Sequence, residues 1–301
     1  MTYPRGCPAI TRMLIKRERW PGGYKGQYVP LVYPGQAVVS NQPVLRLRQN
    51  SDVAPTVSAG LAGHVVAMTH RGGVVIESQA ALVRGTIGAG RQVAGILTLW
   101  RSNEAHQASP LIPPGAILIV PQTLSFALLR QAISSGVSGI VAGSIAHCDL
   151  EGFLRTDLIR LLDTRNIEQA QAYLPPMTLL FTEGLGVAAM PTRIVNFLCR
   201  YQGLTALLSG TTSVRLKICP ELVISLPLEE RLISSEVSPD LVLGSLVRVC
   251  GGEHYGVVGV VDYFFPYQQV FPSGIHAHAV RLRLGDGSTR IVPISQIEQI
   301  E

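Results

Sequence analysis

The stretch GAILIVPQTLSFALLRQAISSGVSGIVAGS, residues 115–144, decides how the middle of the chain folds. Residues 115–121 are a short apolar run of the kind typical of a buried strand. Residues 124–136 then place apolar side chains three and four positions apart, which predicts a helix that stops at Gly136. Residues 137–144 return to an apolar run and predict a second strand.

The same order of elements recurs farther along the chain. Residues 178–184 predict a strand, residues 191–203 a helix opened by proline and closed by glycine, and residues 204–210 a further strand. Strand, helix and strand joined by short connections indicate a small α/β sheet with helices packed on it. We therefore expect an α/β domain over residues 112–226.

Two segments rich in proline, serine and charge, residues 102–115 and 226–240, interrupt the apolar pattern and mark domain boundaries. A chain of 301 residues with 47% hydrophobic residues is long enough for several domains with cores of ordinary size. The sequence predicts a multidomain α+β protein. Its expected parts are a basic N-terminal arm at 1–28, a β domain at 29–101, the α/β domain at 112–226 and a β-barrel at 241–301.

The expected β domain contains two similar halves of turn and strand. Their order resembles a lipoyl/biotinyl-type barrel-sandwich hybrid. The resemblance implies a carrier domain with a modified lysine on the hairpin between the halves, but residues 46–58, RLRQNSDVAPTVS, contain no lysine. We expect a structural or protein-docking element in its place. The residues that carry the resemblance are Val32, Gly35, Val38, Ala54, Pro55, Gly63, Val65, Gly90, Val93, Gly95 and Leu97.

The C-terminal segment alternates strands with glycine turns. Its glycine and valine spacing, together with the closing VPISQIE, resembles a KOW domain, an SH3-like β-barrel found in ribosomal proteins and transcription elongation factors. The resemblance implies contact with RNA or with a protein of a ribonucleoprotein machine. The residues that carry it are Gly244, Val247, Val249, Gly252, Gly256, Gly259 and Val261.

Positive charge is concentrated at the other end of the chain. Residues 1–101 hold 12 Lys/Arg against 3 Asp/Glu, residues 102–240 hold 9 against 12, and residues 241–301 hold 4 against 5. Electrostatic attraction supplies most non-specific affinity for nucleic acids, so the slightly acidic C-terminal barrel is at least as well suited to protein contact. Its candidate partner-binding residues are Arg248, His254, Tyr255 and Tyr267, whereas Phe264 is expected to fill the barrel.

Residues 12–28, RMLIKRERWPGGYKGQY, interleave basic side chains with aromatic rings. Such a pattern can hold a phosphate backbone and its bases. It is equally consistent with an acidic protein partner, or with an arm that docks its rings on the first domain. The candidate nucleic-acid-binding residues are Arg12, Lys16, Arg17, Arg19, Trp20, Tyr24 and Lys25.

The loop FTEGLG, residues 181–186, is the alternative binding site, because ligands of α/β sheets tend to bind beyond the carboxyl ends of strands. Its glycines lack the spacing of a dinucleotide or P-loop fingerprint. The candidate ligand-binding residues are Ser144, Glu183, Gly184, Gly186 and Thr211.

Weaker patterns point to no cofactor or metal. His276 and His278 share one face of a predicted strand, but two ligands do not make a zinc site, even with His254 as a third. Residues 144–149 contain hydrolase-like residue types, but the members of a triad come from separated elements, so we interpret them as a polar loop. The five cysteines form no CxxC pair.

The sequence therefore predicts a cytoplasmic, non-enzymatic adaptor that docks on a protein or ribonucleoprotein partner. It predicts RNA contact through the N-terminal arm, and no association with a membrane because the apolar runs are far shorter than a membrane span. The alternative is a small-ligand-binding protein or an enzyme that uses the 181–186 loop.

Overall fold

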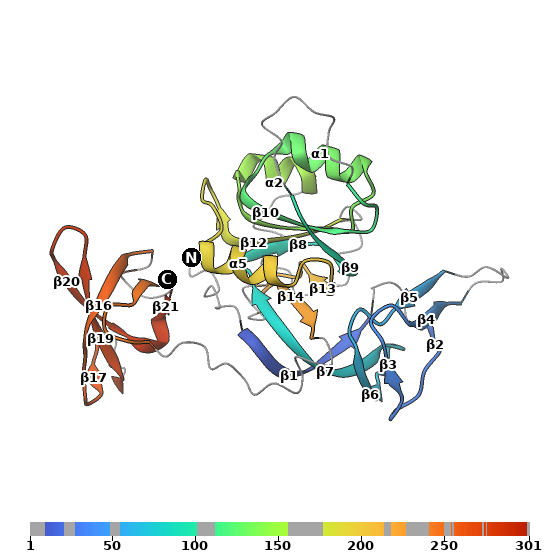
Figure 1. The fold of residues 1–301 in the computed structure, drawn as a ribbon, viewed down its shortest axis with the longest axis horizontal. Helices are drawn as coiled ribbons and strands as arrows, with labels where there is room; N and C mark the ends of the chain where they lie inside the picture. The colour runs from blue at the N-terminus through green and yellow to red at the C-terminus, as the bar shows by residue number, and fades with distance from the viewer. Residues whose placement is uncertain are drawn as a thin grey trace.

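A computed structural model shows a mostly β protein made of two bodies (Figure 1). The larger body is formed by segments of residues 10–226, and the smaller by segments of residues 241–299, which we call the C-terminal module. The structure describes residues 10–20, 28–48, 55–100, 112–155, 177–213, 218–226, 241–249, 254, 256–272, 274 and 276–299.

One large curled sheet forms most of the larger body, in the order β3-β6-β7-β14-β13-β9-β10-β11-β12-β8, with β1 also paired to β7. Strands β9 to β12 are parallel neighbours, whereas β13 and β14 run antiparallel. The strands are β1 (Ile10–Arg19), β3 (Ala37–Val38), β6 (Gly63–Met68), β7 (Val74–Arg84), β8 (Ile87–Ala89), β9 (Gln92–Leu99), β10 (Ile117–Leu124), β11 (Gly139–Ile145), β12 (Thr178–Leu185), β13 (Thr205–Ser209) and β14 (Glu221–Ser225).

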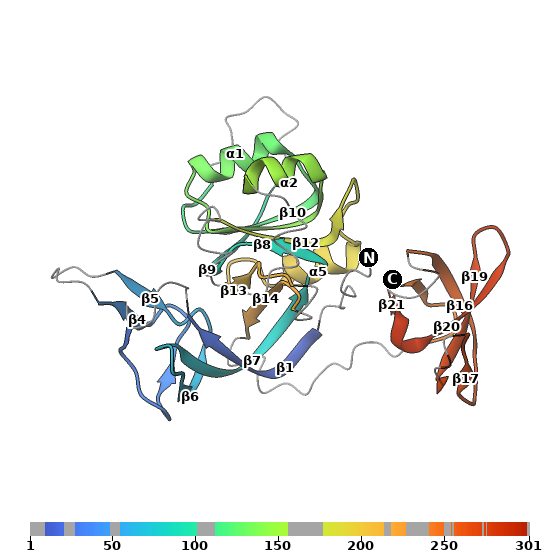
Figure 2. The same cartoon turned by 180° about the vertical axis from the view of Figure 1, so that it is seen from behind.

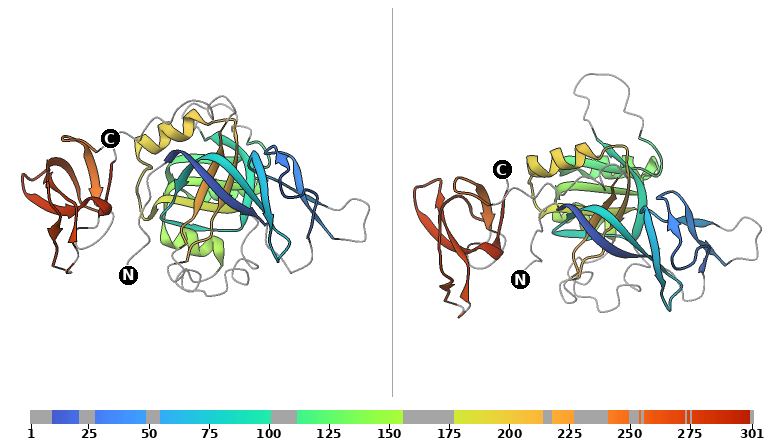
Figure 3. Two further views of the ribbon diagram at one scale, coloured as in Figure 1. Left: turned by 90° about the horizontal axis from the view of Figure 1, so that it is seen from below. Right: turned by 60° about the horizontal axis from the view of Figure 1, so that its bottom comes forward.

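The curled sheet closes on itself between β7 and β8, which follow each other in the chain and form the two ends of one run of paired strands. Figure 3 views this sheet from below. β7 pairs with β14, and β8 pairs with β12. The two residues between β7 and β8 form hydrogen bonds to both neighbouring segments. The Gly85 N–H donates to the Pro220 carbonyl, next to β14, at 2.9 Å, and the Thr86 N–H donates to the Phe181 carbonyl of β12 at 2.8 Å. A side chain at position 85 would collide with Leu180, so glycine is required where the strand changes partner.

Alternate residues of the closed sheet pack into its interior. Ala81 and Val83 of β7 point inward, while Ala80 and Leu82 belong to a cluster outside. Leu180 of β12 meets the same interior, to which helix α5 (Thr192–Arg200) adds the side chains Phe197 and Leu198. Because strands of this sheet are buried on both faces, they appear in the sequence as continuous apolar runs.

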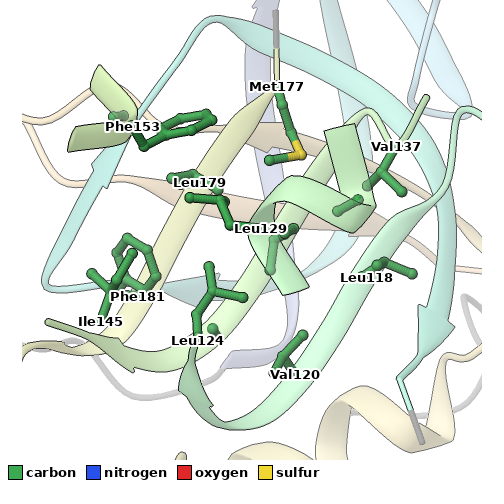
Figure 4. Close-up of a cluster of buried hydrophobic side chains, with 14 of the residues drawn as sticks. Leu118, Val120, Leu124, Leu129, Val137, Ile145, Phe153, Met177, Leu179 and Phe181 are labelled. Carbon is green, nitrogen blue, oxygen red and sulfur yellow. The ribbon is translucent and has the colours of Figure 1, made fainter. Parts of the chain in front are cut away.

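Two separate layers cover the outside of the closed sheet. Helices α1 (Phe126–Ser134) and α2 (His147–Leu154) pack on one side, where Leu129 and Phe153 belong to the same buried cluster as Phe181 of β12 (Figures 2 and 4). On another side the N-terminal strands cover β7, β13 and β14 through a cluster that includes Leu45. Those strands include a three-stranded sheet of β2 (Tyr28–Pro30), β4 (Pro43–Leu47) and β5 (Thr56–Ser58).

The C-terminal module is a second curled sheet with its own core, in the order β20-β19-β16-β15-β21. Val247, Val261, Val280, Leu282 and Val292 fill that core. A short hairpin of β17 (Gln269–Val270) and β18 (His276–Ala277) lies beside it. The strands of the sheet are β15 (Leu246–Val249), β16 (Val258–Phe264), β19 (Ala279–Leu284), β20 (Thr289–Pro293) and β21 (Ile297–Gln299), with a 3-10 turn at Ile294–Gln296.

The structure corrects two of the domain boundaries predicted before the C-terminal module. The boundary at 102–115 does not separate two sheets, because β9 pairs with β10 on one side and β13 on the other. The N-terminal arm expected at 1–28 contains β1, which is paired along β7. Both corrections have the same physical cause: pairing partners distant in sequence decide which sheet a strand joins.

The two predicted helices form at the expected places, and each is shorter than its predicted range. α1 lies within the predicted 124–136, and its N-cap is Ser125, whose side chain accepts the Leu128 N–H. α5 lies within 191–203. Residues 147–154, interpreted in part as a polar loop, form α2 instead, and Leu150 and Phe153 attach that helix to the sheet.

Close contact at the closure predicts that Gly88→Ala destabilises the protein. An added Cβ would lie 2.6 Å from the Leu179 carbonyl oxygen and 2.7 Å from Pro220 Cβ, so we expect a loss of about 1–3 kcal/mol in the free energy of unfolding. Chemical denaturation followed by circular dichroism measures it.

The matched control is Gly152→Ala in helix α2, where the added methyl group has open space. Because alanine favours a helix more than glycine does, we expect this control to raise the free energy of unfolding by roughly 0.5–1 kcal/mol. Equal effects of the two substitutions would contradict the closed sheet.

Candidate functional site

The carboxyl ends of β10, β11 and β12 are filled by the chain itself. Ser144 is fully buried, and its hydroxyl donates to the Ala188 carbonyl and accepts the Ala188 N–H, both at 2.8 Å. Its oxygen also lies 3.0 Å from the Thr123 hydroxyl. The Met190 N–H donates to the Pro121 carbonyl at 2.7 Å. The segment after β12 therefore folds back over the strand ends, and the predicted ligand contact Ser144 is a structural hydrogen-bonding residue here.

Glu183, another predicted ligand contact, pairs with Arg248 of the C-terminal module. The Arg248 guanidinium donates through both of its terminal nitrogens to the two carboxylate oxygens of Glu183. The Glu183 side chain is only 8% exposed and that of Arg248 is 25% exposed. The structure thus joins a residue predicted for ligand binding with one predicted for partner binding.

The glycines of the 181–186 loop are explained by backbone conformation. Gly184 and Gly186 have φ angles of 90° and 123°, a region that favours glycine. The remaining predicted contact, Thr211, lies elsewhere: it follows β13, whose last residue Ser209 pairs with Gln92 at the beginning of β9. Because β9 and β12 both run parallel to their neighbours, that is the opposite end of the sheet from Glu183.

The basic side chains of β1 are held by groups of the same body. Arg17 forms a paired ion bridge with the two carboxylate oxygens of Glu221, at 2.5 and 2.8 Å. Lys16 lies 3.0 Å from Glu77, its cross-strand neighbour on β7. Arg12 donates to the Gln79 side chain at 2.8 and 3.1 Å. These contacts neutralise or occupy the cations that the sequence offers to a phosphate backbone.

Arg19 is buried and holds three segments together. Its guanidinium donates to the Ser58 carbonyl at 2.8 Å and to the carbonyl and side-chain oxygens of Gln92 at 3.3 and 2.9 Å. Burial lowers the pKa of Arg19 to about 10, which leaves it charged at neutral pH. Arg19 therefore serves the packing of β1 against β5 and β9.

Trp20 is buried as well, under the guanidinium of Arg71, which lies 4.3 Å from the ring centre. Arg71 also pairs with Glu18. Burial raises the pKa of Glu18, but hydrogen bonds from Arg71 and Thr69 outweigh it and lower that pKa overall. Tyr24 and Lys25 lie outside the described residues.

The outer face of the C-terminal module carries the exposed residues best suited to binding. Tyr263, Arg281 and Ile291 are neighbours across β16, β19 and β20, and we call these three residues the docking patch. Tyr263 is 43% and Ile291 46% exposed. The Arg281 guanidinium lies 5.5 Å from the centre of the Tyr263 ring and donates to Asp262 at 2.8 Å.

The hydrogen bond and the charge of Asp262 raise the pKa of Arg281. Tyr267, a predicted partner contact, is 79% exposed in the segment between β16 and β17, whereas His254 is half-buried and Tyr255 lies outside the described residues. Phe264 packs against the module core as predicted. The patch residues Arg281 and Ile291 were missed, although the alternation AVRLRL at 279–284 already places Arg281 and Arg283 on the face opposite the core.

Comparison with known proteins gives no assignment: no protein family, no curated protein and no solved structure matches this chain. Within the described segments, no helix is long and apolar enough to cross a membrane. In the same part of the chain, no three His, Cys, Asp or Glu side chains gather as a metal site would require.

The contacts of β1 predict that substitutions of the neighbouring residues Arg17 and Lys16 change the free energy of unfolding by different amounts. Arg17→Gln leaves the poorly exposed Glu221 carboxylate without its bidentate partner, so we expect a loss of about 1–3 kcal/mol in the free energy of unfolding. Lys16→Gln breaks a pair whose lysine is largely exposed, so its effect should stay below about 0.5 kcal/mol.

Urea denaturation of the two variants and the parent chain makes this comparison. A small effect of Arg17→Gln, no larger than that of Lys16→Gln, would show that Arg17 is free to serve an external anion.

Proposed function

We propose that this chain is a non-enzymatic adaptor that docks on a protein or ribonucleoprotein partner through its C-terminal module. The observation that carries the proposal is the docking patch, Tyr263, Arg281 and Ile291, exposed side by side on the outer face of one sheet. Tyrosine and arginine beside an aliphatic side chain are the residue types that contribute most binding energy at protein interfaces.

The geometry of the patch favours a protein surface over a stacked base. The Tyr263 ring packs edge-to-face with Phe265, with centres 5.1 Å apart, and the Arg281 guanidinium lies over the same ring. A ring engaged in this way is pre-organised as a rigid anchor and has less free face for a base. Exposed Val258 and Ile291 add apolar area that a phosphate backbone would not cover.

Charge supports a partner that presents carboxylates to the patch. Arg281 and Arg283 stand on the same face of β19, and Arg283 is exposed. Arg290 does not add to this charge, because it pairs with the core residue Leu282 and stands on the other face of β20. The Asp262 carboxylate offsets only part of this positive charge. Electrostatic complementarity of this kind steers association and selects partners.

The rest of the chain takes a supporting role in this proposal. The C-terminal module is proposed to be KOW-like, and residues 29–101 a carrier-like fold without the lysine, used as scaffold. RNA contact through the N-terminal segment has less support, because Arg12, Lys16, Arg17 and Arg19 are all engaged within the larger body.

The test is affinity purification from the native cell, with and without nuclease, using the parent chain, Tyr263→Ala and Arg281→Glu. We expect a specific set of proteins that survives nuclease and is reduced at least tenfold with either patch variant. Tyr33→Ala is the matched control, because Tyr33 is an exposed tyrosine on the larger body.

If Tyr263→Ala and Arg281→Glu recover the same partners as the parent chain, in equal amounts, the docking patch is refuted. Recovery that depends on intact RNA would instead favour the nucleic-acid form of docking. Circular dichroism of each variant checks that the module is folded.

A further inference from the structure

A β-bulge in β16 places two side chains beside Arg281 of β19. Tyr263 pairs with Arg281, and Asp262 is the extra residue that precedes Tyr263 on the bulged strand. The Nε–H of Arg281 donates to the Asp262 carboxylate at 2.8 Å. The guanidinium also lies over the Tyr263 ring, 5.5 Å from its centre. The bulge therefore holds this arginine through two contacts of different kinds.

The terminal nitrogens of the same guanidinium remain available to a partner. The Arg281 side chain is 43% exposed. Its hydrogen bond to Asp262 uses the Nε edge, and within the described residues its two terminal nitrogens form no hydrogen bond. Two such nitrogens have the geometry to bind both oxygens of one carboxylate. Because the side chain is already held in place, little of its conformational entropy is left to lose on binding.

A second arginine stands on the same face of β19. Arg281 and Arg283 flank Leu282, which fills the module core, and Arg283 is exposed. Residues two positions apart on a strand are separated by about 6–7 Å. Carboxylates two positions apart in an extended peptide have the same separation and point to the same side, so they match both arginines at once. Carboxylates one or three positions apart point to opposite sides of an extended chain.

The surroundings of the two arginines differ. Tyr263 and Ile291 pair with Arg281 from the neighbouring strands, and both side chains are exposed. Arg283 has the exposed, polar Thr289 as its neighbour on β20. The face thus changes from apolar and basic to polar and basic along β19. A protein segment can supply an apolar side chain together with carboxylates, whereas a phosphate backbone supplies only the negative charge.

We propose that the outer face of the C-terminal module binds an extended acidic segment of a partner protein, with one carboxylate on Arg281 and another, two positions away, on Arg283. An apolar side chain of the same segment lies on Tyr263 and Ile291. Asp262 is a positioning residue, which acts through Arg281. This inference rests on the proposed function and specifies the chemistry of the partner.

The test titrates the full chain into fluorescein-labelled peptides and follows fluorescence polarisation. Each peptide is a chain of serine and glycine with two glutamates, and a leucine stands two positions away on either side of the glutamate pair. The glutamates are adjacent, two apart or three apart, and a further peptide has glutamines in their place. We expect the two-apart peptide to bind roughly tenfold more tightly than the others.

Substitution of either arginine should remove this preference. We expect Arg281→Gln and Arg283→Gln each to weaken the two-apart peptide by roughly three- to tenfold, because each removes one charge-assisted contact. The affinities for the three glutamate spacings should then become similar. Equal affinity of the parent chain for all three spacings would overturn the proposal.

Substitutions of Asp262 distinguish positioning from charge alone. Removal of its carboxylate makes the face more positive, so charge alone predicts that Asp262→Ala binds the acidic peptide more tightly. Positioning predicts weaker binding, because the Arg281 guanidinium loses the hydrogen bond that holds it. Asp262→Asn should bind about as well as the parent chain, because its side-chain oxygen can still accept from Arg281. Tighter binding by Asp262→Ala would overturn the positioning role.

Arg290→Gln is the matched control for the arginine substitutions. Arg290 is an exposed arginine of the same module, but it pairs with the core residue Leu282 and stands on the other face of β20. This variant should keep the parent affinities and the preference for the two-apart peptide. Circular dichroism of each variant checks the fold. A single-stranded RNA oligonucleotide that binds through Arg281 and Arg283 more tightly than the two-apart peptide would overturn the choice of a protein partner.

The outcome is separable from the proposed function. Partner recovery from the cell that depends on Tyr263, together with peptides that show no preference for spacing, would refute this inference alone. Spacing-selective peptide binding without a patch-dependent partner in the cell would refute the proposed function alone.

Discussion

The closure between β7 and β8 is the constraint on which the larger body depends. At Gly85 and Thr86 one strand leaves β14 and joins β12, and two consecutive backbone N–H groups are satisfied by opposite neighbours. This passage turns an open sheet into a closed one, and the enclosed side chains become an interior that α5 completes. The helices and the N-terminal strands then cover outer faces that would otherwise expose apolar side chains.

The local elements could be predicted, but the global pairing could not. Apolar period and caps placed α1, α5 and the strands around them, because these signals lie within a few residues of one another. The sheet that β9 joins is decided by its pairing with β10 and with β13, and β13 lies more than a hundred residues away in sequence. The sequence of β9 itself, QVAGILTL, does not indicate which strands pair with it. The proline-rich segment before β10 connects two strands of one sheet, although its composition is typical of a linker between domains.

The candidate site shows the same division. The sequence singled out Glu183 as a ligand contact and Arg248 as a partner contact, and both roles stay predictions. Sequence could not reveal that the two meet, because they belong to separate bodies. The excess of basic residues near the N-terminus was a poor guide to nucleic-acid binding. Arg17 is paired with Glu221, some two hundred positions later in the sequence. A count of charges in the N-terminal segment alone therefore overestimates the positive electrostatic potential at its surface.

Hydrogen exchange at the closure tests the central claim most directly. If the sheet is closed, the amides of Gly85 and Thr86 should exchange only when the whole larger body unfolds, together with amides of β10 and β11. Their exchange should be far slower than that of the exposed Gly186, whose amide donates to the Ile145 carbonyl at the last residue of β11, where local opening suffices to release it. Rapid exchange at Gly85 and Thr86 while β10 and β11 stay protected would mean that the sheet is open at this point, and would contradict the account.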